Sequence, residues 1–304
     1  MRSEAPVTQA AALPPPADPA PQDGPAPQDG PDAAEAIPPV VRGLVSGPSL
    51  VAGGANVIMQ LSRLPVGLGV VESTVESGRV DRHPVKRART TLTYLIVAML
   101  GSSAERAWMR EEINRQHRQV RSAPGADVRY NAFDRELQLW VAACIYWGME
   151  DVYRRFYGEP SGAVLDEFYR HGRRFATTLQ VPDDMWPEDR AAFEEYWRDG
   201  LTKIASTPET RAYLRGIAKA GFLPRSVRRV VGPANRLLTV GFLPPEFREE
   251  LGFSWTPREQ RAFDAAVRAL AFANRTMPKP MREFPYNAYL WDFRRRMRTG
   301  RPFV

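Results

Sequence analysis

A polar cluster in the segment INRQHRQVR, residues 113–121, contains side chains of the types that carry chemistry. If this segment is helical, Asn114, His117 and Arg121 stand at i, i+3 and i+7 and therefore share one face. An imidazole in such a setting binds a metal, transfers a proton or lies hydrogen-bonded in a core. The spacing alone leaves these roles open, and a structural or surface role is the common one for a single histidine.

The cysteine and histidine content limits the other sites that the chain could form. Cys144 is the only cysteine, which excludes a disulfide within the chain and a cysteine-based zinc site and fits a reducing compartment. The other histidines, His83 before a proline and His171 in a basic helical segment, are expected to be structural or exposed. Three histidines in all make a multi-histidine metal site unexpected.

The charge distribution bears on the partners of the protein. The formal net charge is +7, and much of the excess lies in RHPVKRAR, LPRSVRR and RRRMRTGR. Such segments suit nucleic acid or an anionic membrane, although solvated helix faces explain them more simply. No nucleic-acid-binding signature accompanies them, so no nucleic-acid partner is expected.

The hydropathy pattern indicates a location. The N-terminus lacks a continuous apolar segment of the signal-peptide type. The longest stretch of low charge, residues 43–71, is interrupted by glycines, two prolines and Arg63, which argues against a membrane-spanning helix. We therefore expect a cytoplasmic protein and leave peripheral membrane contact open.

The apolar periodicity predicts an all-α protein. Residues 1–39 are rich in Pro, Ala, Asp and Gln and are expected to be a disordered tail, with one helical domain over residues 40–304. Asn131 or Asp134 should cap a helix that is apolar nearly all round and therefore buried. No alternating strand pattern is evident. Helices are predicted over residues 55–64, 84–100, 103–121, 161–179, 187–206, 207–219, 224–239, 244–250 and 256–274.

Several separated motifs resemble one known family. They are, in order, an RxxxT element at Arg87–Thr91, an HxxVR element at His117–Arg121, YNAFDRELQLWVAA, RLLTVGFLPPEFREELGFSWTP and MPKPMREFP. The order resembles that of the latex-clearing rubber oxygenases and the ER-bound oxygenase of mycophenolic acid biosynthesis. The resemblance covers roughly residues 50 to 290, nearly the whole of the expected folded part.

The resemblance implies a helical fold with a globin-like core that binds a b-type haem. It places His117 as the axial ligand of the haem iron, with Arg87 and Thr91 facing the haem pocket. Arg87 or Arg121 would pair with haem propionates, because guanidinium groups suit carboxylates. Characterised members use dioxygen to cleave carbon–carbon double bonds of isoprenoid chains. Dioxygen and a hydrophobic substrate are thus the expected partners, and the apolar aromatic helix is a candidate pocket wall.

The chain also departs from the pattern of that family. Thr90 stands where a rubber oxygenase can carry a lysine that closes the distal iron position. Asn114 replaces a residue that is basic in many relatives, and Ala142 replaces a histidine. A glutamate serves as a base upstream of the RxxxT element in rubber oxygenases, and Glu72 and Glu76 lie in that region. These differences concern the distal pocket and the substrate more than haem binding.

Three functions from different classes follow. The leading hypothesis is a haem-dependent oxygenase that acts on a hydrophobic, isoprenoid-like substrate. The second is a haem carrier or redox sensor without turnover. The third is a helical interaction module whose basic tail binds nucleic acid or anionic lipid without a cofactor.

Overall fold

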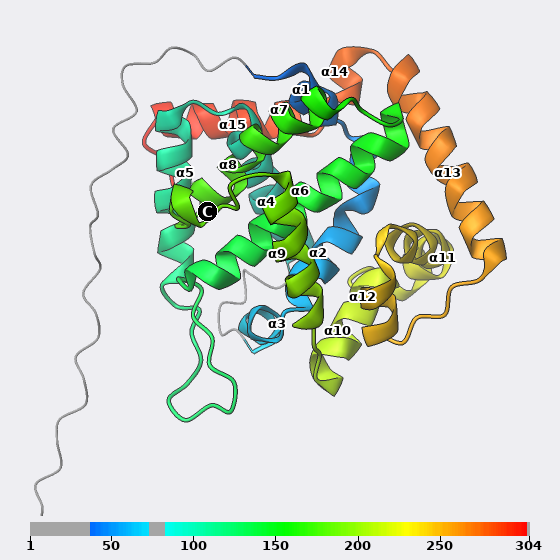
Figure 1. Cartoon of the computed structure of the whole chain (residues 1–304), viewed down its shortest axis with the longest axis horizontal. Helices are drawn as coiled ribbons and strands as arrows, with labels where there is room; N and C mark the ends of the chain where they lie inside the picture. The colour runs from blue at the N-terminus through cyan, green and yellow to red at the C-terminus, as the bar shows by residue number, and fades with distance from the viewer. Residues whose placement is uncertain (1–36, 73–82, 303–304) are drawn as a thin grey trace, which may run out of the picture. The chain divides into compact units, whose positions relative to one another are not determined.

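Helices make up the regular structure of the residues that the computed structural model describes, 37–72 and 83–302 (Figure 1). Within these ranges no strand occurs, and the only extended pairing is an isolated bridge between Arg121 and Asn131. The prediction of an all-α protein is confirmed. The first half contains α1 (Pro39–Leu44), η1 (Pro48–Ala52), α2 (Gly53–Leu61), α3 (Leu64–Val71), α4 (Pro84–Leu100), α5 (Ser103–His117) and α6 (Arg135–Tyr157). The second half contains α7 (Gly162–Gly172), α8 (Arg174–Thr177), η3 (Asp183–Met185), α9 (Arg190–Thr202), α10 (Pro208–Ala218), α11 (Arg225–Phe242), α12 (Pro245–Glu250), α13 (Pro257–Thr276), α14 (Lys279–Arg282) and α15 (Tyr286–Arg298).

The long helix α6 lies at the centre of the packing. Asp134 begins it as predicted, because its carboxylate accepts hydrogen bonds from the backbone N–H groups of Glu136 and Leu137. Its apolar circumference is covered by α2 and α8 along one part of its length and by α13 along another (Figure 1). Trp140 and Tyr146 are almost fully buried there. A helix that is apolar on all sides is thus satisfied by neighbours on all sides.

Helices α4, α5 and α15 form the layer that carries the polar cluster. A capping box between Ser102 and Glu105 begins α5, and the helix α4 ends at Gly101 as predicted. Both α5 and α15 pack against α4. Trp108 of α5 meets Phe293 of α15 edge to face, with 4.9 Å between ring centroids. Helix α15 lies in a segment where no helix was predicted, and it packs along α4 (Figure 1).

Three predicted boundaries were wrong for identifiable reasons. Helix α5 ends at His117 rather than near Arg121, because the chain turns and Val120 N–H bonds back to the His117 carbonyl. Pro65 does not terminate a helix but stands in the first turn of α3, where a missing N–H costs nothing. The expected helix over residues 161–179 breaks at Arg173 into α7 and α8.

One hydrophobic core joins these helices, and every α-helix except α3 and α14 contributes buried members to it. The glycine-rich segment before α4 serves close packing, as expected. A Cβ atom on Gly54 of α2 would lie 2.8 Å from the Thr239 hydroxyl of α11, so this approach requires glycine. Among the described helices, none has the length and apolar character that crossing a bilayer requires.

Candidate functional site

His117 is held at the last position of α5. The buried side chains of Met109 and Ile113 fix the helix against the core, and His117 follows one turn after Ile113. Its ring meets Phe133 edge to face at 6.4 Å between centroids. The Nδ1 atom is buried and makes no hydrogen bond to any described residue. A buried polar atom without a partner is rare in folded proteins, so it marks this imidazole as a candidate ligand.

The protonation state of His117 suits ligation. Burial lowers its pKa to about 4, and the nearby Arg87 guanidinium acts in the same direction. The imidazole is therefore neutral at pH 7. Neutral imidazole has the free lone pair that a metal requires, and it is the form found in metal sites.

Arg87 comes from the first turn of α4, where its N–H bonds to the His83 carbonyl. Burial lowers the pKa of Arg87, and Tyr213 of α10 opposes this shift. No carboxylate among the described residues forms an ion pair with it. A desolvated guanidinium without a counter-charge is costly, so this position needs an anion that the described part of the chain does not supply.

Asn114 and Thr91 complete the polar surroundings. Asn114 precedes His117 by three residues on α5, and its Oδ1 atom is also buried without a described partner. Thr91 follows Arg87 by one turn on α4 and is partly buried. The predicted pairing of Asn114 with His117 on one helix face is thus present.

Arg121 and Glu72 lie apart from this group. Arg121 lies beyond the end of α5, where its backbone pairs with Asn131 in the isolated bridge, and its side chain is exposed. Glu72 is the C-terminal capping residue of α3, and its carboxylate accepts a hydrogen bond from the Tyr130 hydroxyl. Burial raises the pKa of Tyr130, and the negative charge of Glu72 raises it further. Glu76 lies outside the described residues.

Two residues near the group were missed from the sequence. Phe133 could have been found, because it lies in the YNAF motif that leads into α6. Tyr213 could not, because α10 is far from the motifs and only the packing of the helices brings its hydroxyl near Arg87.

A metal site made from protein ligands alone is not seen. No group of three or more His, Cys, Asp and Glu side chains is placed to hold an ion in the described ranges. A single neutral imidazole suits a metal that a macrocycle already holds, because haem iron takes four ligands from the porphyrin. His117 offers one donor of this kind, and Arg87 is a cation that suits a carboxylate.

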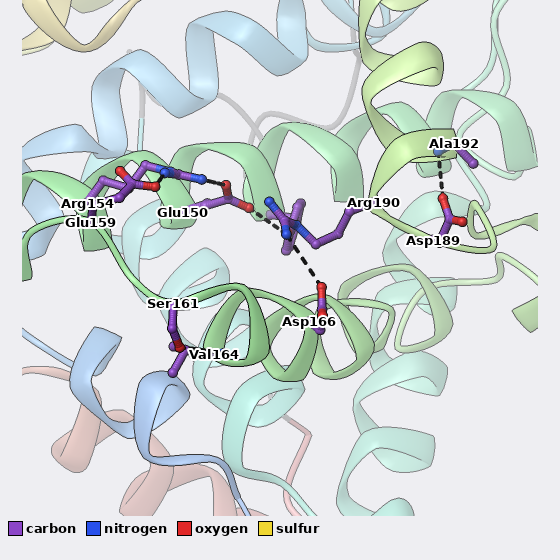
Figure 2. Close-up of polar contacts among 10 residues, drawn as sticks. Glu150, Arg154, Glu159, Ser161, Val164, Asp166, Asp189, Arg190 and Ala192 are labelled. Atoms are coloured by element: carbon purple, nitrogen blue, oxygen red, sulfur yellow. Dashed lines mark hydrogen bonds and ion pairs between the residues drawn. The ribbon is translucent and has the colours of Figure 1, made fainter.

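A cleft between α6 and α9 differs from the His117 group in its polar contacts. Its volume is about 340 Å³, and Trp147 and Trp197 stack in its wall at 5.1 Å between centroids. Figure 2 shows its polar groups satisfied by one another: Arg154 bonds to Glu150 at 2.7 Å, and Arg190 faces Asp166 at 3.4 Å. The aromatic side chains of α6 thus serve core packing and this cleft. At the His117 group, by contrast, the buried His117 Nδ1 and Asn114 Oδ1 atoms have no partner among the described residues.

Comparison with known proteins agrees with these features. Most of the helical fold and the group around His117 and Arg87 lie within the part of the chain that matches a known family. Residues 42–272 match the family model described as "ER-bound oxygenase mpaB/B'/Rubber oxygenase, catalytic domain", and the chain belongs to this family. The match includes α4, α5 and the whole polar group.

Similar proteins also occur in mycobacteria. The chain is 48% identical over 250 residues to an uncharacterized protein of Mycobacterium bovis, covering 82% of this chain and 98% of that protein. The same values hold for an uncharacterized protein of Mycobacterium tuberculosis. No solved structure matches the chain.

Proposed function

We propose that the protein is a haem-b-dependent oxygenase that uses dioxygen on a hydrophobic substrate of the isoprenoid class. The observation that carries the proposal is the buried His117 Nδ1 atom, which has no described partner, near a desolvated Arg87 guanidinium that pairs with no carboxylate among the described residues. The His117 Nδ1 atom requires a ligand or a hydrogen-bond acceptor, and the Arg87 guanidinium requires a negative charge. A haem offers both iron and carboxylates, and membership of an oxygenase family supports the same reading.

Each residue of the chain has a separate part in this scheme. His117 would hold the haem iron through an imidazole lone pair, and its neutral state at pH 7 avoids competition from a proton. Asn114 has an unpartnered carbonyl oxygen that would accept a hydrogen bond from the second ring nitrogen and so hold the tautomer. Arg87 neutralises a propionate, and the exposed Arg121 is the second candidate cation. Thr91 forms a polar part of the pocket wall.

The chemistry requires little from the protein beyond binding and positioning. The bound haem would supply the iron at which dioxygen is activated. Cleavage of one double bond places one oxygen atom on each of its two carbons, so one dioxygen is consumed and no external reductant is needed. Where a proton must be held, Glu72 is our candidate base, with the Tyr130 hydroxyl as its hydrogen-bonding partner.

Dioxygen uptake by haem-supplemented protein tests the activity. Squalene serves as an isoprenoid alkene, and squalane, its saturated analogue, is the matched control because it differs only in lacking double bonds. We expect uptake and carbonyl products with squalene alone. A protein that retains haem but consumes no dioxygen with squalene or other isoprenoid alkenes would be a haem carrier or sensor, and the oxygenase proposal would be wrong.

A further inference from the structure

The segment from residue 210 to residue 245 is basic to an unusual degree. It contains seven Lys and Arg residues and no Asp or Glu. Some of these cations have partners in the fold: Arg211 pairs with Glu250 at 3.1 Å, and Arg236 pairs with Glu259 at 2.6 Å. The cations left over after such pairing are the ones available to an external partner.

Four cations of this segment are exposed and form no ion pair with a carboxylate among the described residues. They are Lys219, just after α10, and Arg225, Arg228 and Arg229 in the first turns of α11. Because no acidic residue occurs between positions 210 and 245, their charges add along one short stretch of surface. This concentration favours an anionic partner over solvent alone.

An apolar stripe lies on the same two turns of α11. Val227, Val230 and Val231 are 44%, 79% and 42% exposed, and their i, i+3, i+4 spacing places them on one face. Ala234 continues the stripe one turn later and is also exposed. The opposite side faces the fold, where Gly232 is buried and a Cβ atom there would lie 3.2 Å from the Lys219 carbonyl.

The placement of α11 leaves this stripe uncovered. Helix α11 packs against α10 and α13 (Figure 1). Its C-terminal part enters the core, with Val240 and Phe242 buried. The N-terminal part, residues 225–231, is exposed at every position. The helix therefore presents apolar and basic side chains together at the surface.

The combination of exposed valines and exposed cations favours some classes of partner over others. A nucleic acid would use the arginines but would gain nothing from three exposed valines against its phosphates. An acidic protein surface would leave the valines equally unexplained. A lipid surface with anionic headgroups takes both, because apolar side chains enter the acyl boundary while basic ones meet the headgroups.

We propose that the N-terminal half of α11, together with Lys219, is a docking surface for an anionic lipid membrane. The docking is peripheral and reversible, and it relies on three valines and four cations rather than on a spanning segment. The inference does not depend on haem binding, since no residue of the surface belongs to the His117 group.

Sedimentation of the full-length protein with vesicles tests the proposal. The probes are vesicles of phosphatidylcholine alone and vesicles with about one third phosphatidylglycerol, at low and high salt. We expect binding to the anionic vesicles at low salt, loss of binding at high salt and little binding to neutral vesicles. Absence of binding to anionic vesicles would overturn the proposal.

Two variants separate the charges from the valines. Replacement of Arg225, Arg228 and Arg229 by Gln should weaken vesicle binding by roughly 100-fold. Val230→Ser should weaken it without changing the net charge. The control removes three exposed cations elsewhere, Arg129, Arg170 and Arg198, and should weaken binding far less. Equal losses for both triple variants would show that only the net charge acts, and the proposed surface would be wrong.

Two further outcomes would assign the surface to another partner. If the wild type binds DNA or RNA more tightly than anionic vesicles, and Val230→Ser has no effect, the surface is a nucleic-acid interface. If light scattering shows a dimer that Val230→Ser dissociates, and vesicles do not bind, it is a contact between copies. Circular dichroism of each variant confirms that the comparison is made on folded protein.

Discussion

At the scale of single residues, the candidate site is distinguished by polar atoms that the fold buries without satisfying them. His117 Nδ1 and Asn114 Oδ1 lie on adjacent turns of α5, and both lack a described partner. Two other buried polar side chains are paired: His171 Nε2 lies 2.8 Å from the Met99 carbonyl oxygen, and the Asn274 side chain bonds to Tyr157. The contrast separates a structural histidine from one available for a ligand.

The lowered pKa of His117 predicts a pH dependence of stability. The folded pKa, about 4, lies below the ordinary value of 6.5, so between these values the unfolded chain binds more protons than the folded one. The haem-free protein should therefore be unaffected by this group above pH 6.5. It should lose up to about 3 kcal/mol as the pH falls from 6.5 to 4.

Urea unfolding at several pH values measures this effect. His117→Gln lacks the titrating ring, so the difference in unfolding free energy between wild type and variant should change across that pH range. A difference that stays constant from pH 7 to pH 4 would mean that the imidazole is not desolvated as described.

Arg87 should lower the stability of the haem-free protein and raise its affinity for haem. Arg87→Met removes a desolvated cation that has no described counter-anion, so the haem-free protein should be as stable as wild type or slightly more stable. The same change should lower the affinity for haem at least about tenfold by removing a charge-assisted contact. Haem titration and thermal unfolding of the same preparations give both values. A large loss of stability with unchanged haem affinity would make Arg87 a structural residue.

At the scale of helices, close packing depends on small residues at particular crossings. A Cβ atom on Gly241 of α11 would lie 2.2 Å from the Phe263 ring of α13, where both neighbours are buried. Gly241→Ala should cost about 1–3 kcal/mol of stability, because the ring must move in a filled core. Gly216→Ala is the matched control: it lies within α10 with nothing within 4 Å of its Cβ position, and should be neutral or stabilising. Chemical denaturation compares the two, and equal effects would refute this packing argument.

The helices that could be predicted from the sequence are those with strong apolar periodicity and clear ends. The prediction for residues 84–100 matches α4, and the Asp134 cap of α6 is confirmed. Helix α15 was missed although Tyr286, Leu290, Phe293 and Met297 recur at helical spacing, because only Tyr286 and Phe293 are buried and the arginine-rich run RRRMR masks the signal. The end of α5 was missed because the competing structure, pairing of residues 120–122 with 130–132, lies ten residues further along the chain.

At the scale of the whole molecule, the described helices form one compact unit that begins at Ala36. Within it the polar group draws on the consecutive helices α4 and α5 and on α10, which comes much later in the sequence. The motifs could identify Arg87, Asn114 and His117 but not their surroundings, because burial and the approach of Tyr213 arise only from helix packing. The exposed position of Arg121 was unpredictable for the same reason.

The molecule also separates two surfaces of different character. The side chains of the polar group at His117 are partly buried, whereas the basic and apolar stripe of α11 is open to solvent. An oxygenase with a hydrophobic substrate would benefit from contact with the lipid phase in which such a substrate dissolves. The two proposals remain independent, since either surface can be altered without touching the other.

The central claim is that His117 is the axial ligand of a haem, and the absorption spectrum of the purified, haem-supplemented protein tests it most directly. The account predicts a sharp Soret band that is lost in His117→Ala and retained in His83→Ala, which removes an exposed histidine near the start of α4. Circular dichroism of both variants should show an intact helical fold. A Soret band of full intensity in His117→Ala, or a wild-type protein that takes up no haem, would contradict the account.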